Sequence, residues 1–462
     1  MICATCFDPA RTAIQLNLRS KIPMTDLTFT VEPGGALRGR LRVPGDKSIS
    51  HRAIMLGALA EGMTAVTGFL EGEDCLATLR AFRAMGVRID GPDQGRVTIH
   101  GVGPRGLRAP AGTLDMGNSG TSMRLMSGLL AGQAFDTVLS GDASLNRRPM
   151  RRVTEPLALM GACIEATESG TAPLWIRGGR RLTGIDYLLP VASAQVKSCL
   201  LLAGLYAEGI TRVIEPAPTR DHTERMLEGF GYPLAREGDR TVAITGGGTL
   251  LGTAIDVPAD ISSAAFFLVG ASIGPGSELL LEHVGVNPTR TGVIDILRLM
   301  GADIEVLNPR LAGGEPVADL RVRHAPLHGI QIPKDLVPLA IDEFPALFIA
   351  AACAEGITVL TGAEELRVKE SDRIQVMADG LTALGIAAGP TTDGIVIRGG
   401  TLSGGTVDSH GDHRIAMSFA MAALCASDPV LIHDCANVNT SFPDFVALAR
   451  IAGLNLAERE AA

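Results

Sequence analysis

The stretch VPGDKSISHRAIMLGALAEGMTAVTGF, residues 43–69, decides the fold because its pattern returns along the chain. It begins with a short polar segment, continues into an Ala- and Leu-rich run, and passes through a Gly-containing turn into a strand-like run. A run that is apolar on nearly all sides is typical of a buried helix. The stretch therefore predicts a buried helix followed directly by a strand.

Five later stretches repeat this pattern, at residues 115–141, 190–216, 257–283, 340–363 and 409–434. A second, amphipathic stretch follows each copy and ends at a glycine: Gly86, Gly161, Gly231, Gly301, Gly385 and Gly453. These glycines lie 68–84 residues apart, which predicts six units of about 73 residues. Each unit is expected to contain a strand, a helix, a strand, a second helix and one or two short strands. Since six units are too many for one core, we expect an α/β fold with two lobes of three units each.

The polar segments before the buried helices carry more charge than helix capping needs. Side chains such as Ser and Asp cap a helix by accepting hydrogen bonds from its first N–H groups. Capping does not account for the cations in these segments, which are Lys47, Arg52, Arg124, Lys197 and Arg414. A helix N-terminus also attracts anions through its free N–H groups and its dipole. We therefore expect the six helix starts to share an anion-binding cleft between the lobes.

The composition excludes several classes of function. The 462 residues include 41 Lys and Arg against 50 Asp and Glu, and only 13 Phe, 3 Tyr and 1 Trp. An acidic protein with few aromatic residues is unsuited to binding nucleic acid. The longest apolar stretches are well short of the roughly 18 residues of a membrane span. The cysteines follow no disulfide framework, which predicts a reduced, cytoplasmic protein.

Two nucleotide-binding signatures fail on their context. Residues 101–106 match G-x-G-x-x-G, but no helix is expected after them. Gly45-Asp-Lys-Ser48 resembles the end of a P-loop without its first glycine. Cys3 and Cys6 form an isolated C-x-x-C pair, and no His, Cys or carboxylate cluster has metal-ligand spacing. We expect no cofactor and no metal, a disordered extension over residues 1–24, and a tail over residues 456–462.

Further cations lie in loops at equivalent positions of successive units. These loops are RRP at 147–149, RDHTE at 220–224, NPTRTG at 287–292 and RVKESDR at 367–373. Loops at equivalent positions of a repeat tend to share one face, and several arginines together suit phosphate or carboxylate groups. In the last loop, the spacing places Lys369, Glu370 and Arg373 one turn apart at a helix start. The pattern predicts a site for a small polyanion.

Carboxylates supply the acid–base candidates. Asp342 and Glu343 precede a buried helix, between Ile341 and Phe344. Burial raises the pKa of a carboxyl group and neighbouring cations lower it, so we expect one carboxylate to be ionised and another to carry a proton. His413, between Asp412 and Arg414, is equally consistent with a catalytic and a structural role.

Taken together, the motifs resemble the 5-enolpyruvylshikimate-3-phosphate synthase family over residues 27–455. The resemblance rests on VPGDKSISHRA, DMGNSGTSMRL, RRP, ASAQVKS, RDHTE, NPTR, ESDR, DHRIAM and TSFPDF, and it is strongest with the class II branch. It implies the inverted α/β barrel-like fold of enolpyruvyl transferases, with six βαβαββ repeats in two domains. One domain would span 43–257, and the other would combine 25–42 with 258–455. The resemblance also implies a cytoplasmic enzyme of aromatic amino-acid biosynthesis that glyphosate inhibits, and we expect a monomer.

The resemblance also implies two substrates and their ligands. Shikimate 3-phosphate would be held by Lys47, Ser48, Arg52, Ser193, Gln195, Arg220, Asp342 and Lys369. Phosphoenolpyruvate would be held by Lys47, Gly120, Arg148, Gln195, Arg373 and Arg414. Asp342 would act as base on the 5-hydroxyl and Glu370 as proton donor and acceptor at C3, with Lys47 and His413 beside them. Class I members place a Lys near Ser441, which this chain lacks.

Two alternatives stay open from the sequence. UDP-N-acetylglucosamine enolpyruvyl transferase shares the fold and chemistry, but it carries a Cys in the loop that here reads GDASLNRRP, residues 141–149. The second alternative is a non-catalytic metabolite-binding protein built from the repeat. Intact Lys47, Asp342, Glu370 and Arg373 favour an enzyme over that alternative.

Overall fold

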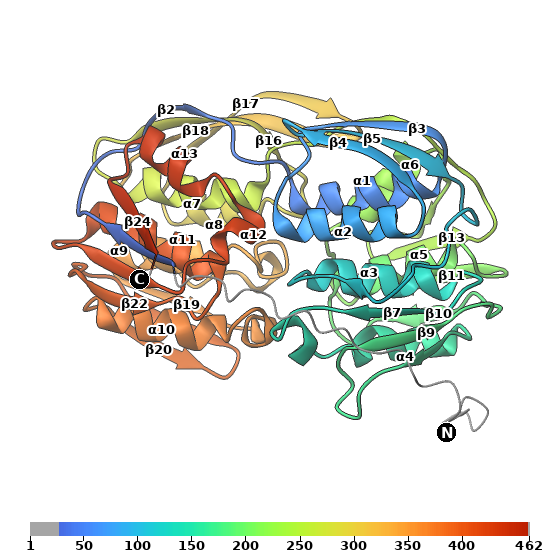
Figure 1. The fold of residues 1–462 in the computed structure, drawn as a ribbon. Helices are drawn as coiled ribbons and strands as arrows, with labels where there is room; N and C mark the ends of the chain where they lie inside the picture. Colours follow the sequence, from blue (N-terminus) through green and yellow to red (C-terminus); the bar gives the residue numbers. More distant parts are fainter. Residues whose placement is uncertain (1–26, 461–462) are drawn as a thin grey trace.

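The computed structural model describes residues 27–460, which form two lobes side by side (Figure 1). The first lobe, on the right of Figure 1, contains the chain from helix α1 (Lys47–Leu59) to strand β15 (Ala254–Asp256). The second lobe contains the rest, including strands β1 (Leu27–Val31) and β2 (Arg38–Leu41) from the N-terminal part. The two-lobed α/β arrangement that the sequence predicts is confirmed. The expected extension over residues 1–24, with Cys3 and Cys6, lies outside the described residues.

Six inner helices form the centres of the lobes. They are α1, α3 (Gly120–Ala131) and α5 (Ala194–Gly204) in the first lobe, and α7 (Ile261–Ile273), α9 (Phe344–Cys353) and α11 (His413–Ala422) in the second. Their side chains are buried along nearly the whole helix, as the all-apolar runs predict. Within each lobe these helices pack against one another, α3 against α5 and α7 against α9 and α11.

Outer helices follow the inner ones and bury one face only. They are α2 (Glu73–Ala84), α4 (Arg151–Leu159), α6 (His222–Gly229), α8 (Gly292–Leu299), α10 (Arg373–Ala383) and α13 (Phe445–Ala452). Each ends next to one of the six regularly spaced glycines, and all six glycines have positive φ, from 79° to 114°. Glycine adopts this left-handed conformation without the steric cost of a Cβ atom, so it ends the helix. The predicted helix ends are confirmed.

Three sheets cover the first lobe. In the first sheet, β14 (Leu250–Leu251) and β15 both pair with β3 (Ala60–Thr67), and β5 (Arg96–Val102) and β4 (Arg88–Asp93) follow. The second sheet has the order β6 (Leu114–Asp115), β7 (Thr137–Ser140), β9 (Leu174–Arg177) and β8 (Cys163–Glu165). The third has the order β10 (Asp186–Leu188), β11 (Ile210–Ile214), β13 (Thr241–Thr245) and β12 (Ala235–Arg236). In each sheet the first pairing is parallel and the later ones are antiparallel. No helix opens after residues 101–106 in this described part, as expected.

Three sheets also cover the second lobe. The first has the order β2, β16 (Glu278–Gly285), β18 (Glu315–Arg323) and β17 (Asp303–Ala312). The second has the order β19 (Ile357–Leu360), β21 (Gly394–Arg398) and β20 (Ala387–Thr391). The third has the order β22 (Gly405–Asp408), β23 (Val430–His433), β1 and β24 (Leu456–Glu460). The prediction that a tail begins at residue 456 is wrong for residues 456–460. These residues pair antiparallel with β1, from Leu27 opposite Glu460 to Val31 opposite Leu456.

The chain crosses between the lobes twice, and the two crossing segments pair with each other. The Asp46 N–H donates to the Pro258 carbonyl at 2.8 Å, and the Asp260 N–H donates to the Pro44 carbonyl at 2.9 Å. Strand β2, which precedes the first crossing, pairs with β16, which follows the second. Strand β15, which precedes the second crossing, pairs with β3, which follows the first. The buried apolar residues divide at the same points, into one core from Ile49 to Val257 and another from the remaining chain.

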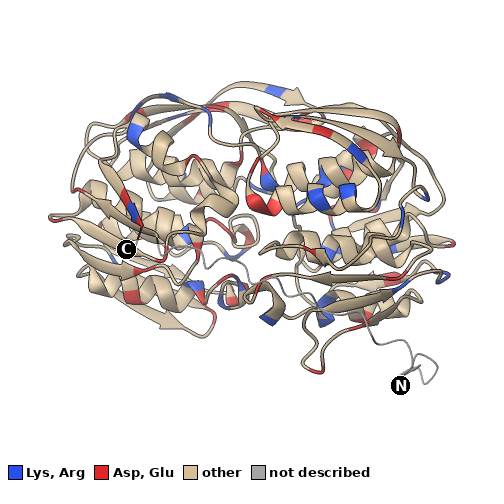
Figure 2. Ribbon diagram, in the orientation of Figure 1, with Lys and Arg blue, Asp and Glu red and all other residues tan. Residues whose placement is uncertain are grey.

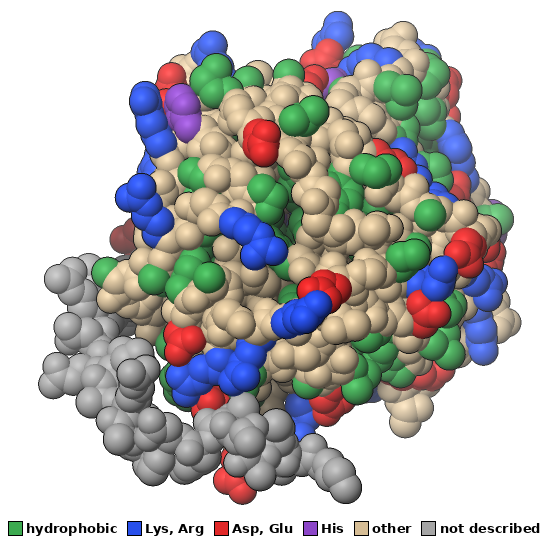
Figure 3. Space-filling view, turned by 90° about the vertical axis from the view of Figure 1, so that its right-hand side faces the viewer, with side chains coloured by type: hydrophobic (Ala, Val, Ile, Leu, Met, Phe, Trp, Pro, Cys, Tyr) green, Lys and Arg blue, Asp and Glu red, His purple; other side chains and the backbone are tan. Residues whose placement is uncertain are grey.

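The surface and the lobe boundary differ in charge. On the outer face of the first lobe, charged side chains of both signs lie among small groups of hydrophobic ones (Figure 3). At the boundary between the lobes, basic and acidic segments face each other (Figure 2). Within residues 27–460, every helix is too short or too polar to span a bilayer.

Candidate active site

A pocket at the lobe boundary brings together the starts of all six inner helices. Each helix contributes first-turn residues or a residue one or two positions before its start: Lys47 and Ser48, Gly120 and Thr121, Ala194 and Gln195, Asp260 and Ser262, Asp342, and His413 and Arg414. These helices therefore direct their N–H groups and the positive ends of their dipoles at one space. The shared cleft predicted from the polar segments is confirmed.

Side chains cap five of the six inner helices. The capping residues are Asp46, Ser119, Ser193, Asp260 and Asp412. Ser193 accepts from the Val196 N–H at 3.4 Å and is not among the residues that line the pocket. The other predicted site residues all line it. The structure therefore places Ser193 at the helix end beside the pocket, because its hydroxyl is used to cap α5.

Cations of the first lobe are oriented by neutral partners. The Arg148 guanidinium donates to Asn118 at 2.9 Å, and Arg124 donates to the Gln195 amide oxygen at 2.6 Å. Arg52 donates to the Thr223 hydroxyl at 2.6 Å and to Ser198 at 2.9 Å. Burial lowers the pKa of Arg52 and of Arg124 to about 10, so both remain charged near neutral pH. These side chains are held in position without losing their positive charge.

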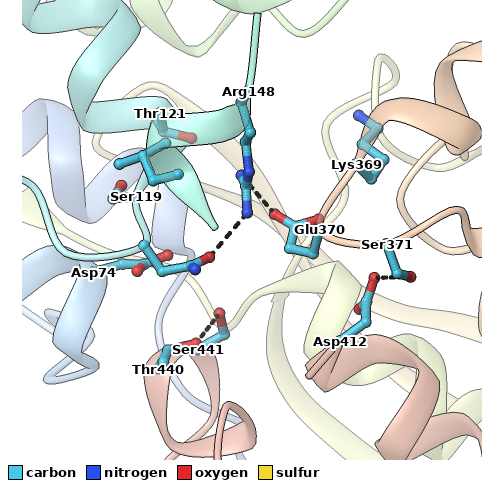
Figure 4. A network of polar contacts seen from close by, with 12 residues as sticks. Asp74, Ser119, Thr121, Arg148, Lys369, Glu370, Ser371, Asp412, Thr440 and Ser441 are labelled. Atoms are coloured by element: carbon cyan, nitrogen blue, oxygen red, sulfur yellow. Dashed lines mark hydrogen bonds and ion pairs between the residues drawn. The ribbon is translucent and has the colours of Figure 1, made fainter. Parts of the chain in front are cut away.

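The carboxylates of the second lobe face these cations across the boundary. Asp342 pairs with Arg220 of the first lobe at 2.6 Å, and also with Lys369 at 3.3 Å and Arg373 at 3.4 Å. Glu370 pairs with Arg148 of the first lobe at 3.1 Å (Figure 4). It also pairs with Arg373 at 2.6 Å. The protein's own carboxylates therefore bind the cations that the sequence assigns to substrate anions.

Both carboxylates are held in the ionised form. Burial favours the neutral form of Asp342, but Lys369, Arg220, Arg414 and Arg373 outweigh burial and hold its pKa well below the usual range. Burial of Glu370 is likewise outweighed by cations, Arg373 first and Arg148 next, so its pKa is also well below the usual range. The low pKa of Asp342 agrees with the expectation of one ionised carboxylate at this helix start, and its several cationic neighbours are the cause.

His413 is neutral and faces the pocket. Burial, reinforced by Lys47, lowers the pKa of His413 to about 3. Its Nε2 atom is buried and has no hydrogen-bond partner among the described residues. A neutral imidazole cannot supply the proton for an acid step near pH 7. The ring nitrogen is nevertheless free to bind a group that enters the pocket.

The loop that carries Glu370 differs in one respect from the sequence prediction. Lys369 and Glu370 lie between a short 3₁₀ turn (Glu364–Val368) and α10, rather than in the first turn of α10. The helix begins at Arg373 because Asp372 caps it by accepting from the Gln375 N–H at 3.1 Å. Glu370 is thus part of a loop that bends toward the first lobe.

Two residues around Lys47 were not found by sequence reasoning. The Lys47 ammonium donates to Asp74 of α2 at 3.1 Å and to Ser441 of α12 (Val438–Ser441) at 2.7 Å. Burial of Asp74 raises its pKa, although Lys47 opposes the shift. In the sequence, Asp74 resembles an ordinary acidic residue in the first turn of a helix, so nothing marks it as a site residue. Ser441 is separated from Lys47 by 394 residues, so the sequence does not show that they are in contact. The one indication in the sequence was the absence, near Ser441, of the lysine found in class I members.

Comparison with known proteins identifies the family. A sequence model of EPSP synthase (3-phosphoshikimate 1-carboxyvinyltransferase) matches residues 31–448, most of the chain. The chain belongs to the EPSP synthase family. Relatives named 3-phosphoshikimate 1-carboxyvinyltransferase include those of Methylococcus capsulatus, 74% identical over 93% of this chain and 98% of its own, and Alkalilimnicola ehrlichii, 73% identical over 94% and 98%.

A solved EPSP synthase structure from Acinetobacter baumannii has the same fold. It superposes with a TM-score of 0.85 at 62% identity, covering 94% of this chain and 100% of that chain. The family therefore matches the resemblance found in the sequence. In this EPSP synthase family member, no three His, Cys, Asp or Glu residues gather as metal ligands within residues 27–460.

Proposed function

We propose that the pocket catalyses the reaction for which its relatives are named. The enolpyruvyl group of phosphoenolpyruvate is transferred to the 5-hydroxyl of shikimate 3-phosphate, giving 5-enolpyruvylshikimate 3-phosphate and phosphate. The observation that carries the proposal is the meeting of Arg148, Arg220, Lys369 and Arg373 with Asp342 and Glu370 in one pocket. Two small polyanions require such a set of cations, and acid–base chemistry requires the carboxylates.

The two substrates divide the pocket between them. We assign to shikimate 3-phosphate Lys47, Ser48, Arg52, Gln195, Arg220, Asp342 and Lys369, with Ser193 supporting Gln195 through the cap of α5. We assign to phosphoenolpyruvate Lys47, Gly120, Arg148, Gln195, Arg373 and Arg414. The phosphate and carboxylate groups then replace the protein carboxylates as partners of the cations. Helix N–H groups from both lobes add further donors.

The chemistry is an addition followed by an elimination. Asp342 takes the proton of the 5-hydroxyl while that oxygen bonds to C2 of phosphoenolpyruvate, and Glu370 gives a proton to C3. The C2–O bond to phosphate then breaks, C3 returns a proton to Glu370, and the proton taken by Asp342 leaves with the phosphate as hydrogen phosphate. Lys47 stabilises the charge that develops on the departing phosphate, and the neutral His413 ring lies beside it. Closure of the lobes excludes water from the cationic intermediate.

Binding of phosphoenolpyruvate is expected to raise the pKa of Glu370, so that Glu370 can take up a proton from solvent. The pKa of Glu370 is low because Arg373 and Arg148 neutralise its charge. When phosphoenolpyruvate pairs with these arginines, Glu370 loses that stabilisation and gains an anionic neighbour, and both changes raise its pKa. Glu370 is therefore expected to become an acid only when phosphoenolpyruvate is bound.

We extend the proposal to the architecture and the setting. Each sheet, with its inner and outer helix, represents one of six βαβαββ repeats, with domain boundaries at 43–257 and at 25–42 plus 258–455. The division of the apolar core supports these boundaries. Cys75, Cys199, Cys353 and Cys425 are free thiols, which supports a cytoplasmic location. The pocket is complete within one chain, which supports a monomer.

A phosphate-release assay tests the function. The purified protein is incubated with phosphoenolpyruvate and either shikimate 3-phosphate or UDP-N-acetylglucosamine. Release that depends on shikimate 3-phosphate supports the proposal. Release with UDP-N-acetylglucosamine alone would assign the other enolpyruvyl transferase reaction. Binding of both substrates without release would indicate a non-catalytic protein.

A further inference from the structure

Arg290 occupies the centre of the lobe boundary and has no role in the proposed reaction. It lies in the NPTR loop between β16 and α8, and only 2% of its surface is exposed. Its guanidinium contacts the Asp46 carboxylate at 3.0 Å, the Asp260 carboxylate at 3.0 Å and the Ser262 hydroxyl at 2.7 Å. A planar guanidinium can serve several acceptors at fixed angles, which a lysine cannot do. Arg290 thus contacts groups from both lobes at once.

The two aspartates that Arg290 joins are the caps of the first inner helix in each lobe. Asp46 caps α1 by accepting from the Ile49 N–H at 2.9 Å, and Asp260 caps α7 by accepting from the Ser262 N–H at 2.8 Å. Asp260 also accepts from the Lys47 N–H of the other lobe at 3.2 Å. Arg290 therefore fixes the start of α1, where Lys47 and Ser48 enter the pocket.

A second path leads from Arg290 to Asp342. The Ser262 hydroxyl donates to the Glu343 carboxylate, and Glu343 is the neighbour of Asp342 in the chain. The Glu343 carboxylate also lies 3.9 Å from the Arg290 guanidinium. Removing Arg290 would leave these buried carboxylates without their common cation, and they would repel one another. One side chain thus holds the segments that carry Lys47 and Asp342.

A histidine orients Arg290 from the other side. Its guanidinium donates to His222 Nε2 at 3.2 Å, and His222 Nδ1 lies 2.8 Å from Glu315. A guanidinium has no acceptor, so Nε2 must accept and the ring proton is on Nδ1, facing Glu315. Asn287 donates to the second Glu315 oxygen at 3.0 Å. The RDHTE and NPTR motifs thus meet across the lobe boundary.

We infer that Arg290 is a positioning residue that sets Lys47 of the first lobe and Asp342 of the second in their catalytic arrangement. The inference rests on the proposed roles of these two residues. A displacement of about 1 Å between reacting groups can lower a rate roughly a hundredfold while binding changes far less. Loss of Arg290 should therefore appear in kcat more than in KM.

The test compares Arg290→Lys with Arg225→Lys. Arg225 also joins the lobes, since it pairs with Asp221 at 2.9 Å and donates to the Gly314 carbonyl at 3.3 Å, but it touches neither helix cap. Steady-state kinetics with shikimate 3-phosphate and phosphoenolpyruvate should show kcat about 100-fold lower in Arg290→Lys, with each KM changed less than about threefold. Arg225→Lys should keep the wild-type kcat. A twofold or smaller fall in kcat for Arg290→Lys, or an equal fall in Arg225→Lys, would overturn the inference.

A second variant keeps the test decisive if Arg290→Lys fails to fold. Asp46→Asn retains a good N-cap for α1 but removes the charge that pairs with Arg290. It should lower kcat at least tenfold in protein that remains folded. A wild-type kcat in this variant would contradict the inference. The wild-type assay separates the two proposals, because absence of turnover there would refute the proposed function and not the role of Arg290.

Discussion

At the scale of single residues, the site is a set of ion pairs between side chains of the two lobes. Arg220 and Arg148 bind Asp342 and Glu370 where substrate anions would bind. Breaking a buried pair without a replacement is costly, because it leaves an uncompensated charge. A substrate anion avoids that cost by taking the place of the carboxylate. Each carboxylate then remains close to its former cationic partners. The charge of the bound substrate sets its pKa, and so decides whether it is ionised or protonated.

Glu370→Gln tests the acid role. We expect kcat to fall by about 10²–10⁴-fold, because an amide neither donates nor accepts the C3 proton. KM for phosphoenolpyruvate should stay unchanged or decrease, since Arg148 and Arg373 lose a competing anion. Asp342→Ala should likewise lower kcat by orders of magnitude. The measurement is steady-state phosphate release, and near-normal turnover in either variant would exclude the assigned role.

Gly120→Ala tests the crowding of the phosphoenolpyruvate site. A Cβ atom at Gly120 would lie 3.0 Å from Arg148 Nη1 and 3.2 Å from Arg124 Nη1. Both are ends of flexible side chains, so the fold should tolerate the methyl group while the guanidinium groups shift. We expect a higher KM for phosphoenolpyruvate and a higher inhibitory concentration of glyphosate. Both follow from inhibition curves at several substrate concentrations, and superimposable curves for the two proteins would refute the prediction.

At the scale of elements, close helix packing places the pocket residues. Helices α3 and α5 contact each other through Gly128, and their N-termini carry Gly120 and Gln195. A Cβ atom at Gly128 would lie 2.0 Å from the Cys199 carbonyl oxygen, which is backbone and cannot rotate away. The distance between the two helices is therefore set by the absence of a side chain at this position.

Gly128→Ala should separate α3 from α5. We expect a loss of about 3 kcal/mol or more in the free energy of unfolding, since overpacking against backbone forces the helices apart. KM for both substrates should rise because Gly120 and Gln195 move. The matched control is Gly229→Ala at the end of α6, where the nearest atom is 4.0 Å away. That variant should be neutral or about 0.5–1 kcal/mol more stable. Urea unfolding of both variants measures the difference, and equal stabilities would contradict it.

At the scale of the whole molecule, the lobes have separate cores and a polar boundary. Apolar packing stabilises each lobe by itself, whereas charged and polar contacts hold the lobes together. Arg152 and Glu365 add a pair at 3.0 Å across the same boundary. Substrate anions can replace the carboxylates in such contacts, whereas an apolar interface offers no charged partner to replace. The arrangement suits lobes that open and close around ligands.

The stability of the molecule should depend on pH through buried histidine. Burial lowers the pKa of His413 to about 3, and burial also lowers the pKa of His51 well below its usual value. Below pH 6.5 the unfolded chain therefore binds more protons than the folded protein, and the free energy of unfolding decreases as the pH falls toward 3. Carboxylates with lowered pKa, such as Asp342 and Glu370, add to the loss below about pH 4.

His413→Gln isolates this contribution. The variant should reduce the slope of unfolding free energy against pH between pH 6 and 5 by up to about 1.4 kcal/mol per pH unit, the value for one proton. The measurement is urea unfolding at pH 7.5, 6 and 5 for both proteins. Parallel slopes would show that His413 binds protons equally in the folded and unfolded states.

The sequence by itself determined the repeating helix and glycine pattern, the lobes and the cations and carboxylates of the site. These features depend on local periodicity and on which residue types a phosphate or a proton transfer needs. The tertiary structure alone shows that residues 456–460 pair with β1, that β2 pairs with β16 and that β15 pairs with β3. It alone also shows that Ser441 accepts a hydrogen bond from Lys47 and that Arg290 joins Asp46 to Asp260. Those contacts join residues far apart in the chain. They depend on how the surfaces of the two packed lobes fit together, and local sequence periodicity contains no information about that packing.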